Sequence, residues 1–131
     1  IELPATADFE VTSALVKAAT KLDEHYHTGI IHSKDSFYGQ HNPASMAVSY
    51  ELENKWKAFI KCGVLASEME TAALFTVSAV RNIRAGSILH AIWNQERRKS
   101  GDNSENINTE NAVLTAIEAL KIIIAEDKMI N

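Results

Sequence analysis

Two carboxylates flank a methionine at the start of a predicted helix. Glu68, Met69 and Glu70 directly precede the apolar run at residues 71–75. An ionised carboxylate only accepts hydrogen bonds, so one carboxylate can hold two neighbouring hydroxyl donors, such as the 2′ and 3′ hydroxyls of a ribose. Charge-assisted bonds of this kind are stronger than neutral ones. The spacing fits an ordinary acidic first turn equally well, because the helix dipole also favours a carboxylate there.

An upstream segment, residues 33–44, combines aromatic and amide side chains. Phe37 offers a ring face, and Gln40 can donate and accept a hydrogen bond at once, which matches the alternating N–H and C=O edge of uracil. The same residues fit a plain surface loop whose aromatic side chains turn into the core. From residue types alone, the plain loop is the favoured interpretation.

Both segments resemble the nucleoside phosphorylase superfamily, in its uridine phosphorylase branch. Residues 66–74 (ASEMETAAL) resemble the Glu-Met-Glu signature of that branch, and residues 33–40 (SKDSFYGQ) resemble its pyrimidine-binding loop. Residues 3–10 resemble the lead-in to the preceding helix, and residues 85–94 fit the element that follows the signature. The resemblance covers nearly the whole chain in order, and it implies reversible phosphorolysis of uridine to uracil and ribose 1-phosphate.

The resemblance also implies how the sugar is held. Glu70 would bind the ribose hydroxyls, and Met69 would pack on the sugar. Glu68 would be a further ribose contact or a residue behind Glu70.

The base site implied by the resemblance lies mainly in the upstream segment. Its expected residues are Lys34, Phe37, Gln40 and His41, with Ile92 and Trp93 as an apolar wall, although a core role fits Ile92 and Trp93 equally well. The branch carries an arginine where this chain has Asn42. Lys34 or His41 is therefore expected to serve catalysis, by donating to the base carbonyl oxygen on which charge develops.

The attacking group in this chemistry is phosphate itself, so no covalent enzyme intermediate and no cofactor are expected. Gly-x-Ser-x-Gly and glycine-rich dinucleotide or phosphate loops are missing from the sequence. Purine-specific members carry an Asp after the strand that corresponds to residues 86–93, whereas this chain has Asn94 and Gln95. An amide cannot act as a general acid, so we expect a pyrimidine nucleoside.

Apolar periodicity predicts alternating helices and strands. The expected helices span residues 11–22 with Asp8 as N-cap, 50–62 before Gly63, 73–80, and 113–124 with Asn108 or Thr109 as cap. The expected strands span residues 25–32, 64–66 and 86–93. This order predicts an α/β fold with a largely parallel sheet, and the resemblance implies a three-layer α/β/α architecture with a central mixed sheet, present here as its C-terminal half.

Ligands in such folds bind beyond the carboxyl ends of the strands. Three polar segments follow the predicted strands, at residues 33–42, 67–71 and 94–96. We expect these segments to converge on one site.

The composition is that of a globular protein, with 46% hydrophobic and 23% charged residues in a chain of 131. One domain over residues 1–131 is expected. A net charge of −4 without a broad basic field argues against nucleic-acid binding. The basic run at residues 97–99 is expected to be a solvated loop.

Histidine and cysteine placement predicts neither a metal site nor a disulfide. His25 and His27 face one side of the predicted strand, but no third ligand accompanies them. His90 is expected to be a hydrogen-bonded core histidine. Cys62 is the single cysteine, which is typical of a reducing cytoplasm. No signal peptide and no membrane span of ~20 apolar residues is recognised.

The chain starts without Met, and its matched segments belong to the C-terminal half of the family's domain. We therefore expect a fragment that is inactive alone. The resemblance assigns the phosphate-binding glycine loop and arginines to the missing N-terminal half, and it implies a homo-oligomer, a hexamer built from dimers. Two alternatives remain open: a phosphate-independent nucleosidase of the same superfamily, and a truncated, non-catalytic nucleoside-binding module.

Overall fold

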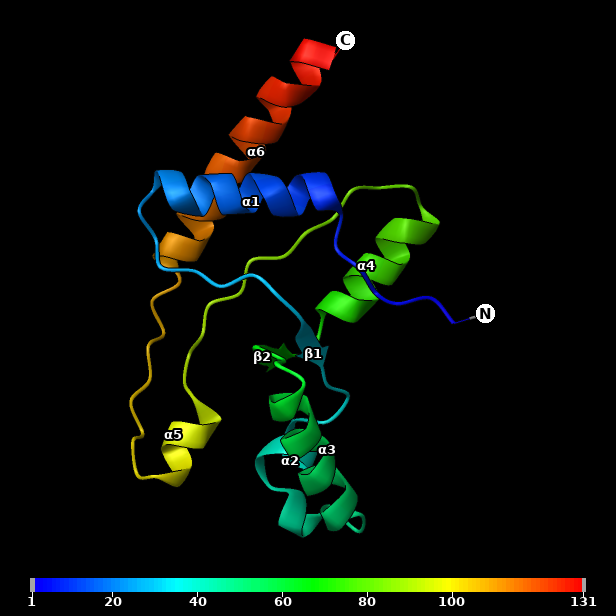
Figure 1. The fold of residues 1–131 in the computed structure, drawn as a ribbon, viewed down its shortest axis with the longest axis vertical. Helices are drawn as coiled ribbons and strands as arrows, with labels where there is room; N and C mark the ends of the chain where they lie inside the picture. The colour runs from blue at the N-terminus through cyan, green and yellow to red at the C-terminus, as the bar shows by residue number, and fades with distance from the viewer. Residues whose placement is uncertain (1, 131) are drawn as a thin grey trace. The chain divides into compact units, whose positions relative to one another are not determined.

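The computed structural model describes residues 2–130, which form two compact units (Figure 1). Within these residues the first unit spans 2–6 and 27–81, and the second spans 7–26 and 82–130. Ile1 and Asn131 lie outside the described residues. Each unit is described by itself, and the single domain expected over residues 1–131 stays a prediction.

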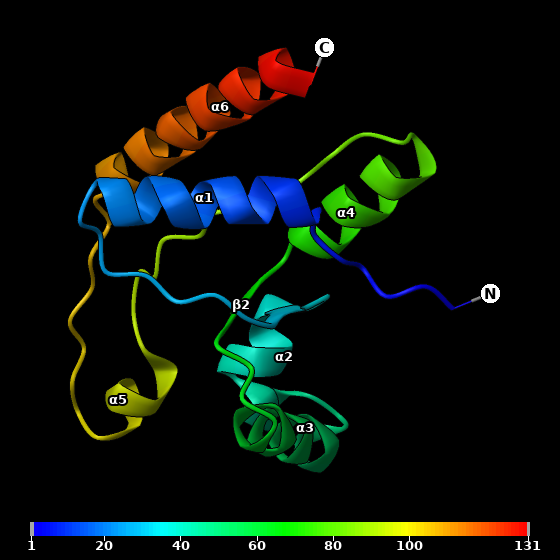
Figure 2. The same cartoon turned by 45° about the horizontal axis from the view of Figure 1, so that its top comes forward.

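The second unit is built on two helices, α1 (Phe9–Lys21) and α6 (Glu110–Ile130). Figures 1 and 2 show α1 (blue) lying across α6 (orange to red). Ala14 and Ala18 of α1 are fully buried and meet Ala119 of α6, which is 2% exposed. Alanine has almost no side chain, so the two helix backbones can approach closely at this contact.

Side-chain hydrogen bonds lie at the start of both helices. The Asp8 carboxylate accepts a hydrogen bond from the Val11 amide at 3.0 Å, which satisfies one of the first free N–H groups of α1. The Asn108 side chain accepts from the Glu110 amide at 3.0 Å at the start of α6. The predicted cap Asp8 is thus confirmed, and the choice between Asn108 and Thr109 as the cap of α6 stays open.

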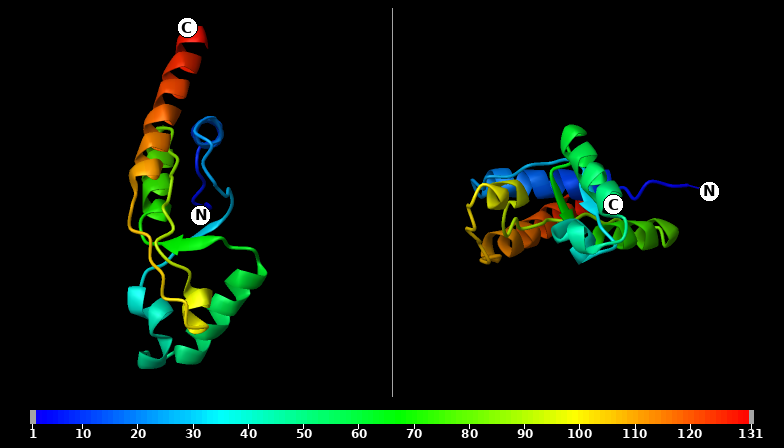
Figure 3. Two further views of the ribbon diagram at one scale, coloured as in Figure 1. Left: turned by 90° about the vertical axis from the view of Figure 1, so that its left-hand side faces the viewer. Right: turned by 90° about the horizontal axis from the view of Figure 1, so that it is seen from below.

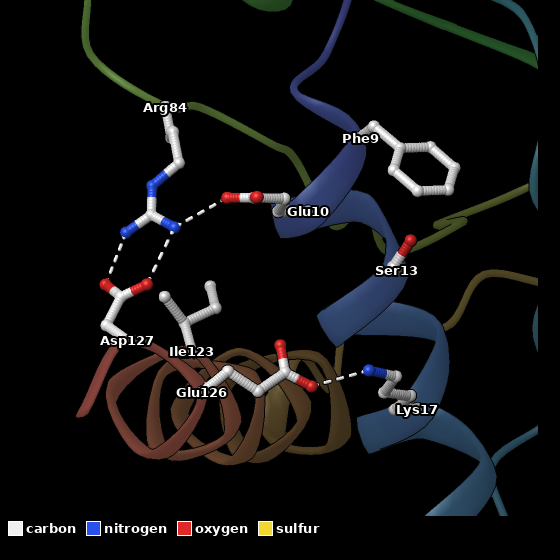
Figure 4. A pocket seen from close by; sticks show the side chains of 8 residues that line it. All are labelled: Phe9, Glu10, Ser13, Lys17, Arg84, Ile123, Glu126 and Asp127. Carbon is white, nitrogen blue, oxygen red and sulfur yellow. Dashed lines mark hydrogen bonds and ion pairs between the residues drawn. The ribbon is translucent and has the colours of Figure 1, made fainter. Parts of the chain in front are cut away.

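A hollow of about 250 Å³ lies between the N-terminal half of α1 and the C-terminal half of α6 (Figure 4). Arg84 bridges Glu10 at 2.7 Å and Asp127 at 2.5 Å. Lys17 pairs with Glu126 at 2.6 Å. Every charged side chain that lines the hollow is therefore paired with an opposite charge. These partly exposed ion pairs link α1 to α6 directly and through Arg84.

Residues 83–94 of the second unit have no regular secondary structure, so the predicted strand at 86–93 is wrong. Gly86 of this segment instead packs against α1, where a Cβ on Gly86 would come within 2.5 Å of a Val11 methyl group. A strand is stable only when its backbone pairs with a neighbour. The described part of the second unit supplies no other strand. His90 is nevertheless satisfied, because its Nε2 lies 2.8 Å from the Asn106 carbonyl oxygen.

The first unit contains the parallel strand pair β1 (Ile31–Ser33) and β2 (Ala66–Glu68). The helices of this unit are α2 (Phe37–His41), the 3₁₀ turn η1 (Pro43–Ser45), α3 (Ser49–Lys61) and α4 (Thr71–Val80). Helices α2, η1 and α3 pack together (Figure 3, cyan to green). The predicted mixed α/β fold with parallel strands is confirmed, in a sheet of two strands.

The lengths of several elements differ from the sequence prediction. The strand expected at 25–32 is limited to β1, because its partner β2 is three residues long. The stretch expected to be a loop, 33–44, contains α2, since the Ser36 hydroxyl accepts from the Gly39 amide at 3.0 Å and caps that helix. Helix α3 ends before Gly63, whose φ of 74° terminates it as predicted.

None of the helices within residues 2–130 is long and apolar enough to span a membrane.

Candidate functional site

The two parallel strands bring two of the three predicted site segments together in the first unit. Ser33, the last residue of β1, lies opposite Glu68, the last residue of β2. The Lys34 amide continues the ladder by donating to the Glu68 carbonyl oxygen at 2.8 Å. Because parallel strands end at the same edge of the sheet, the segments at 33–42 and 67–71 emerge side by side. The third segment, 94–96, belongs to the second unit, and its convergence stays a prediction.

Glu68 is fully engaged by hydrogen bonds within the protein. Its Oε1 accepts from the hydroxyls of Ser33 and of Thr71, the latter at 2.7 Å. Its Oε2 accepts from the amides of Glu70 and Thr71, both at 2.6 Å. A carboxylate has about four acceptor positions, and all of them are occupied here.

These bonds also set the ionisation of Glu68. Burial opposes the charged form, but the bonds donated by Ser33, Glu70 and Thr71 outweigh it and lower the pKa of Glu68 from 4.5 to about 2. Glu68 is therefore an anion at neutral pH at the start of α4, and its hydrogen-bond donors come from β1 and from the helix itself.

Glu70 differs from Glu68 in its exposure and in its hydrogen bonding. Its side chain is exposed, and the bond from the Met69 amide at 3.0 Å is the hydrogen bond that its carboxylate accepts. Met69 beside it is 44% exposed. Glu70 is the N-cap of α4, but its own side chain makes no capping bond. Its carboxylate therefore keeps acceptor positions for the hydroxyls of a ligand.

Ser33 and Thr71 were not identified from the sequence as site residues. The Ser33 hydroxyl accepts from the Ala72 amide at 3.0 Å and lies 3.1 Å from the Thr71 hydroxyl. Thr71 is 7% exposed. The Glu-x-x-Thr spacing is a usable signal for the bond between Glu68 and the Thr71 amide, because a helix-capping side chain typically bonds an amide three residues on. The contact with Ser33 has no local signal, since 35 residues separate Ser33 from Glu68.

The predicted base residues gather on and beside α2. The Phe37 and His41 rings lie 4.3 Å apart, and helical geometry explains this because residues four apart share one helix face. The buried Lys34 places its ammonium 5.9 Å from the Phe37 ring centroid and donates to the Ser67 hydroxyl at 3.3 Å. Gln40 is partly buried on the same short helix.

The arrangement suits a flat polar ligand. Phe37 keeps a 48% exposed ring, and both the Lys34 ammonium and the His41 imidazole lie near it. Strands β1 and β2 join this group to the Glu68–Glu70 turn. An aromatic face, cationic or imidazole N–H donors and an accepting carboxylate thus occur within one unit of the fold.

Residues 1–126 match the family model of the phosphorylase superfamily. The match covers nearly all of the chain. The chain belongs to the phosphorylase superfamily.

Relatives of this phosphorylase-superfamily chain carry two substrate names. A uridine phosphorylase of Treponema pallidum is 47% identical over 128 residues, which are 97% of this chain and 50% of the relative. A uridine phosphorylase of Thermococcus kodakarensis is 36% identical over 98% of this chain and 46% of its own length. A guanosine phosphorylase of Halorubrum lacusprofundi is 30% identical over 92% of this chain and 48% of its own length. The chain spans about half the length of the relatives it matches.

The remaining predicted residues of this phosphorylase-superfamily chain lie in the second unit. Asn94 caps the short helix α5 (Gln95–Lys99) by accepting from the amides of Glu96 and Arg97 at 3.0 Å. The Trp93 ring lies 4.1 Å from the Arg98 guanidinium. Ile92 is 47% exposed. A base-site role for Ile92 and Trp93 stays a prediction.

The basic run at 97–99 is exposed, as expected, but it is helical and not a loop. The Asn94 cap explains this difference, because it satisfies the first amides of α5. Arg98 pairs with Glu105 at 2.5 Å, and Lys99 pairs with Glu96 at 2.8 Å. Both charges are therefore balanced locally.

Candidate metal ligands do not cluster among the described residues of this phosphorylase-superfamily chain. His25 and His27 are exposed. His32 packs its ring 4.3 Å from that of Phe59. Burial, with a further contribution from Lys55, lowers the pKa of His32 and favours its neutral form.

Proposed function

We propose that the polypeptide containing this chain is a uridine phosphorylase, which converts uridine and phosphate reversibly into uracil and ribose 1-phosphate. The observation that carries the proposal is the 47% identity to the Treponema pallidum uridine phosphorylase over 97% of this chain. In this reaction a phosphate oxygen bonds to the anomeric carbon, and the bond from that carbon to the base nitrogen breaks. The bonding electrons leave with uracil, which then takes up a proton.

In this proposal Glu70 binds the ribose hydroxyls and Met69 packs on the sugar. The support is the exposure of both side chains and the acceptor positions that Glu70 retains. A carboxylate that accepts from two adjacent hydroxyls orients the sugar and so aligns its anomeric carbon for attack. The saturated hydrogen bonding of Glu68 favours a supporting role for that residue over direct contact with the ribose.

The base would lie against Phe37, with Gln40 at its hydrogen-bonding edge. Lys34 and His41, which both lie near the Phe37 ring, would donate to the carbonyl oxygen that gains charge as the glycosidic bond breaks. Such preorganised donors stabilise the transition state because they need no reorganisation when the charge develops.

Phosphate is the co-substrate in this scheme, and no cofactor takes part. The residues that hold phosphate would lie in the part of the polypeptide beyond this chain, so the 131 residues alone should not turn over. We further propose a homo-oligomer, a hexamer built from dimers, and a cytoplasmic location.

The decisive experiment assays the full-length polypeptide for base release from uridine, with and without phosphate, and from guanosine in parallel. The proposal expects uracil and ribose 1-phosphate only when phosphate is present, and a higher kcat/KM for uridine than for guanosine. Uracil release without phosphate would identify a nucleosidase. A preference for guanosine would overturn the pyrimidine assignment, and phosphate-dependent turnover by the 131-residue chain would overturn the predicted need for further residues.

A further inference from the structure

We propose that Ser33 and Thr71 are positioning residues for Glu70, acting through Glu68, and that they thereby set a preference for ribose over 2′-deoxyribose nucleosides. The three residues Ser33, Glu68 and Thr71 are called the Ser33 network below. The substrate preference rests on the proposed function, whereas the positioning itself concerns the fold of the first unit.

The Ser33 network links three elements at one point. Ser33 ends β1, Glu68 ends β2, and Thr71 begins α4. Ser33 contacts both of the other elements, because its hydroxyl donates to Glu68 and accepts from the Ala72 amide of α4 at 3.0 Å. The start of α4 is therefore bonded to β1, which is distant in sequence, as well as to β2, which directly precedes the helix.

Glu68 transmits this fixation to Glu70. Its Oε2 accepts from the Glu70 and Thr71 amides at 2.6 Å, so the two consecutive N–H groups on either side of Glu70 point at one oxygen. These bonds orient the peptide groups around Glu70, the N-cap of α4, whose φ of −120° and ψ of −34° are not helical values. The Glu70 carboxylate accepts one hydrogen bond, from the Met69 amide. The direction of the Glu70 side chain therefore depends on the peptide groups that are bonded to Glu68.

Loss of the Ser33 hydroxyl would remove its contacts with the Glu68 carboxylate, the Thr71 hydroxyl and the Ala72 amide. Glu68 Oε1 would retain the bond from the Thr71 hydroxyl, and the Ala72 amide would lose its side-chain acceptor. The carboxylate would keep its bonds from the Thr71 hydroxyl and from the Glu70 and Thr71 amides but lose its tie to β1, so that any shift of the carboxylate would move the Glu70 amide with it. A displacement of about 1 Å at a substrate-positioning group is enough to reduce catalysis strongly.

The experiment compares kcat/KM for uridine and 2′-deoxyuridine in the full-length polypeptide. Ser33→Ala and Thr71→Val test the network, and Thr71→Ser restores its hydroxyl. Thr76→Val is the matched control on the same helix, because the Thr76 hydroxyl donates only to its own helix, to the Ala72 carbonyl at 2.7 Å. Ser45→Ala is the control for serine, since its hydroxyl makes a local bond to the Asn42 carbonyl at 2.8 Å.

Ser33→Ala and Thr71→Val should each lower the uridine to 2′-deoxyuridine ratio of kcat/KM about tenfold, because a charge-assisted bond to the 2′ hydroxyl weakens. Thr71→Ser, Thr76→Val and Ser45→Ala should keep the wild-type ratio. In a Glu70→Ala background, Ser33→Ala should not lower the ratio further. Equal losses for both substrates, or an additive effect on the ratio in that background, would show a purely structural role and overturn the proposal.

Crystal structures of the wild type, Ser33→Ala and Ser45→Ala decide the positioning even if the polypeptide shows no phosphorolysis. The proposal expects the Glu70 carboxylate of Ser33→Ala to move by about 1 Å or more, and that of Ser45→Ala to stay in place. An unmoved Glu70 in a folded Ser33→Ala protein would overturn the positioning role. Absence of uridine turnover in the wild type, with Glu70 displaced in Ser33→Ala, would overturn the proposed function and leave the positioning role established.

Discussion

Ser33 and Glu68 face each other in the parallel register of β1 and β2, and the Ser33 hydroxyl donates a hydrogen bond to the Glu68 carboxylate. This contact gives Glu68 and Glu70, the two acids around Met69, different roles. Glu68 is turned inward and saturated by donors, whereas Glu70 is exposed and retains acceptor positions. Two carboxylates that are equivalent in the sequence are therefore different groups in the folded protein.

Replacement of Glu70 should mainly affect catalysis. Glu70→Ala in the full-length polypeptide is expected to lower kcat/KM for uridine more than tenfold, which is about 1.4 kcal/mol of transition-state binding. The exposed Glu53 of α3 provides the matched control, as Glu53→Ala removes the same group elsewhere in the first unit. Steady-state kinetics check the prediction, and wild-type values for Glu70→Ala would contradict the ribose assignment.

Replacement of Glu68 should affect stability and its pH dependence. The folded protein holds the pKa of Glu68 at about 2, against 4.5 for the ordinary group, so the unfolded chain takes up the proton first as the pH falls. The stabilisation is therefore present above the ordinary pKa and is lost as the pH falls through the folded value.

Urea denaturation of wild type and Glu68→Gln between about pH 7 and pH 2 measures this contribution. At neutral pH, Glu68→Gln should lose about 1–3 kcal/mol, because an amide cannot accept all four bonds. The difference from wild type should shrink towards the acid end. Glu53→Gln is the control, and a difference that is independent of pH would contradict the assigned pKa.

Lys34 and His41 are expected to stabilise charge on the departing base. Lys34→Met keeps the apolar stem but removes the ammonium, and together with His41→Ala it should lower kcat/KM for uridine by about 10²-fold or more. Lys57→Met changes an exposed lysine on α3 and should leave kcat/KM unchanged. Unchanged kinetics in the double variant would refute the role of both residues.

The contact between α1 and α6 depends on small side chains. Ala119→Leu should destabilise the protein by about 1–3 kcal/mol, because the added atoms would have to enter a contact in which Ala119 is 2% exposed. Ala125→Leu places the same residue at an exposed position of α6 and should change stability little. Thermal or urea unfolding measures both, and equal stability of the two variants would contradict the packing.

The helices with side-chain or glycine signals could be predicted closely from the sequence. Asp8 caps α1, Asn108 supports the start of α6, and α3 ends before Gly63, as expected. These features depend on residues within one helical turn of each other. Local chemistry decides them, so local sequence reveals them.

The segments whose structure depends on distant backbone were predicted poorly. Residues 86–93 are apolar enough for a buried strand but have no strand to pair with among the described residues of the second unit. Residues 25–30 were expected in a strand, yet β1 begins at Ile31 because its ladder extends only as far as β2. Strand formation requires partners from elsewhere in the chain, and no local pattern specifies their length.

The sequence by itself determined the family, the α/β order and the residue types at the site, because motif identity and apolar periodicity are local properties. Only the tertiary structure decided which acid is the exposed one. Ser33 reaches Glu68 across 35 residues of chain, and this bond exists only because β1 and β2 pair in one register. The same pairing sets Lys34 beside Ser67, and the fold of α2 sets His41 against Phe37. Relative placement of side chains follows from backbone pairing and helix geometry, which residue types alone do not encode.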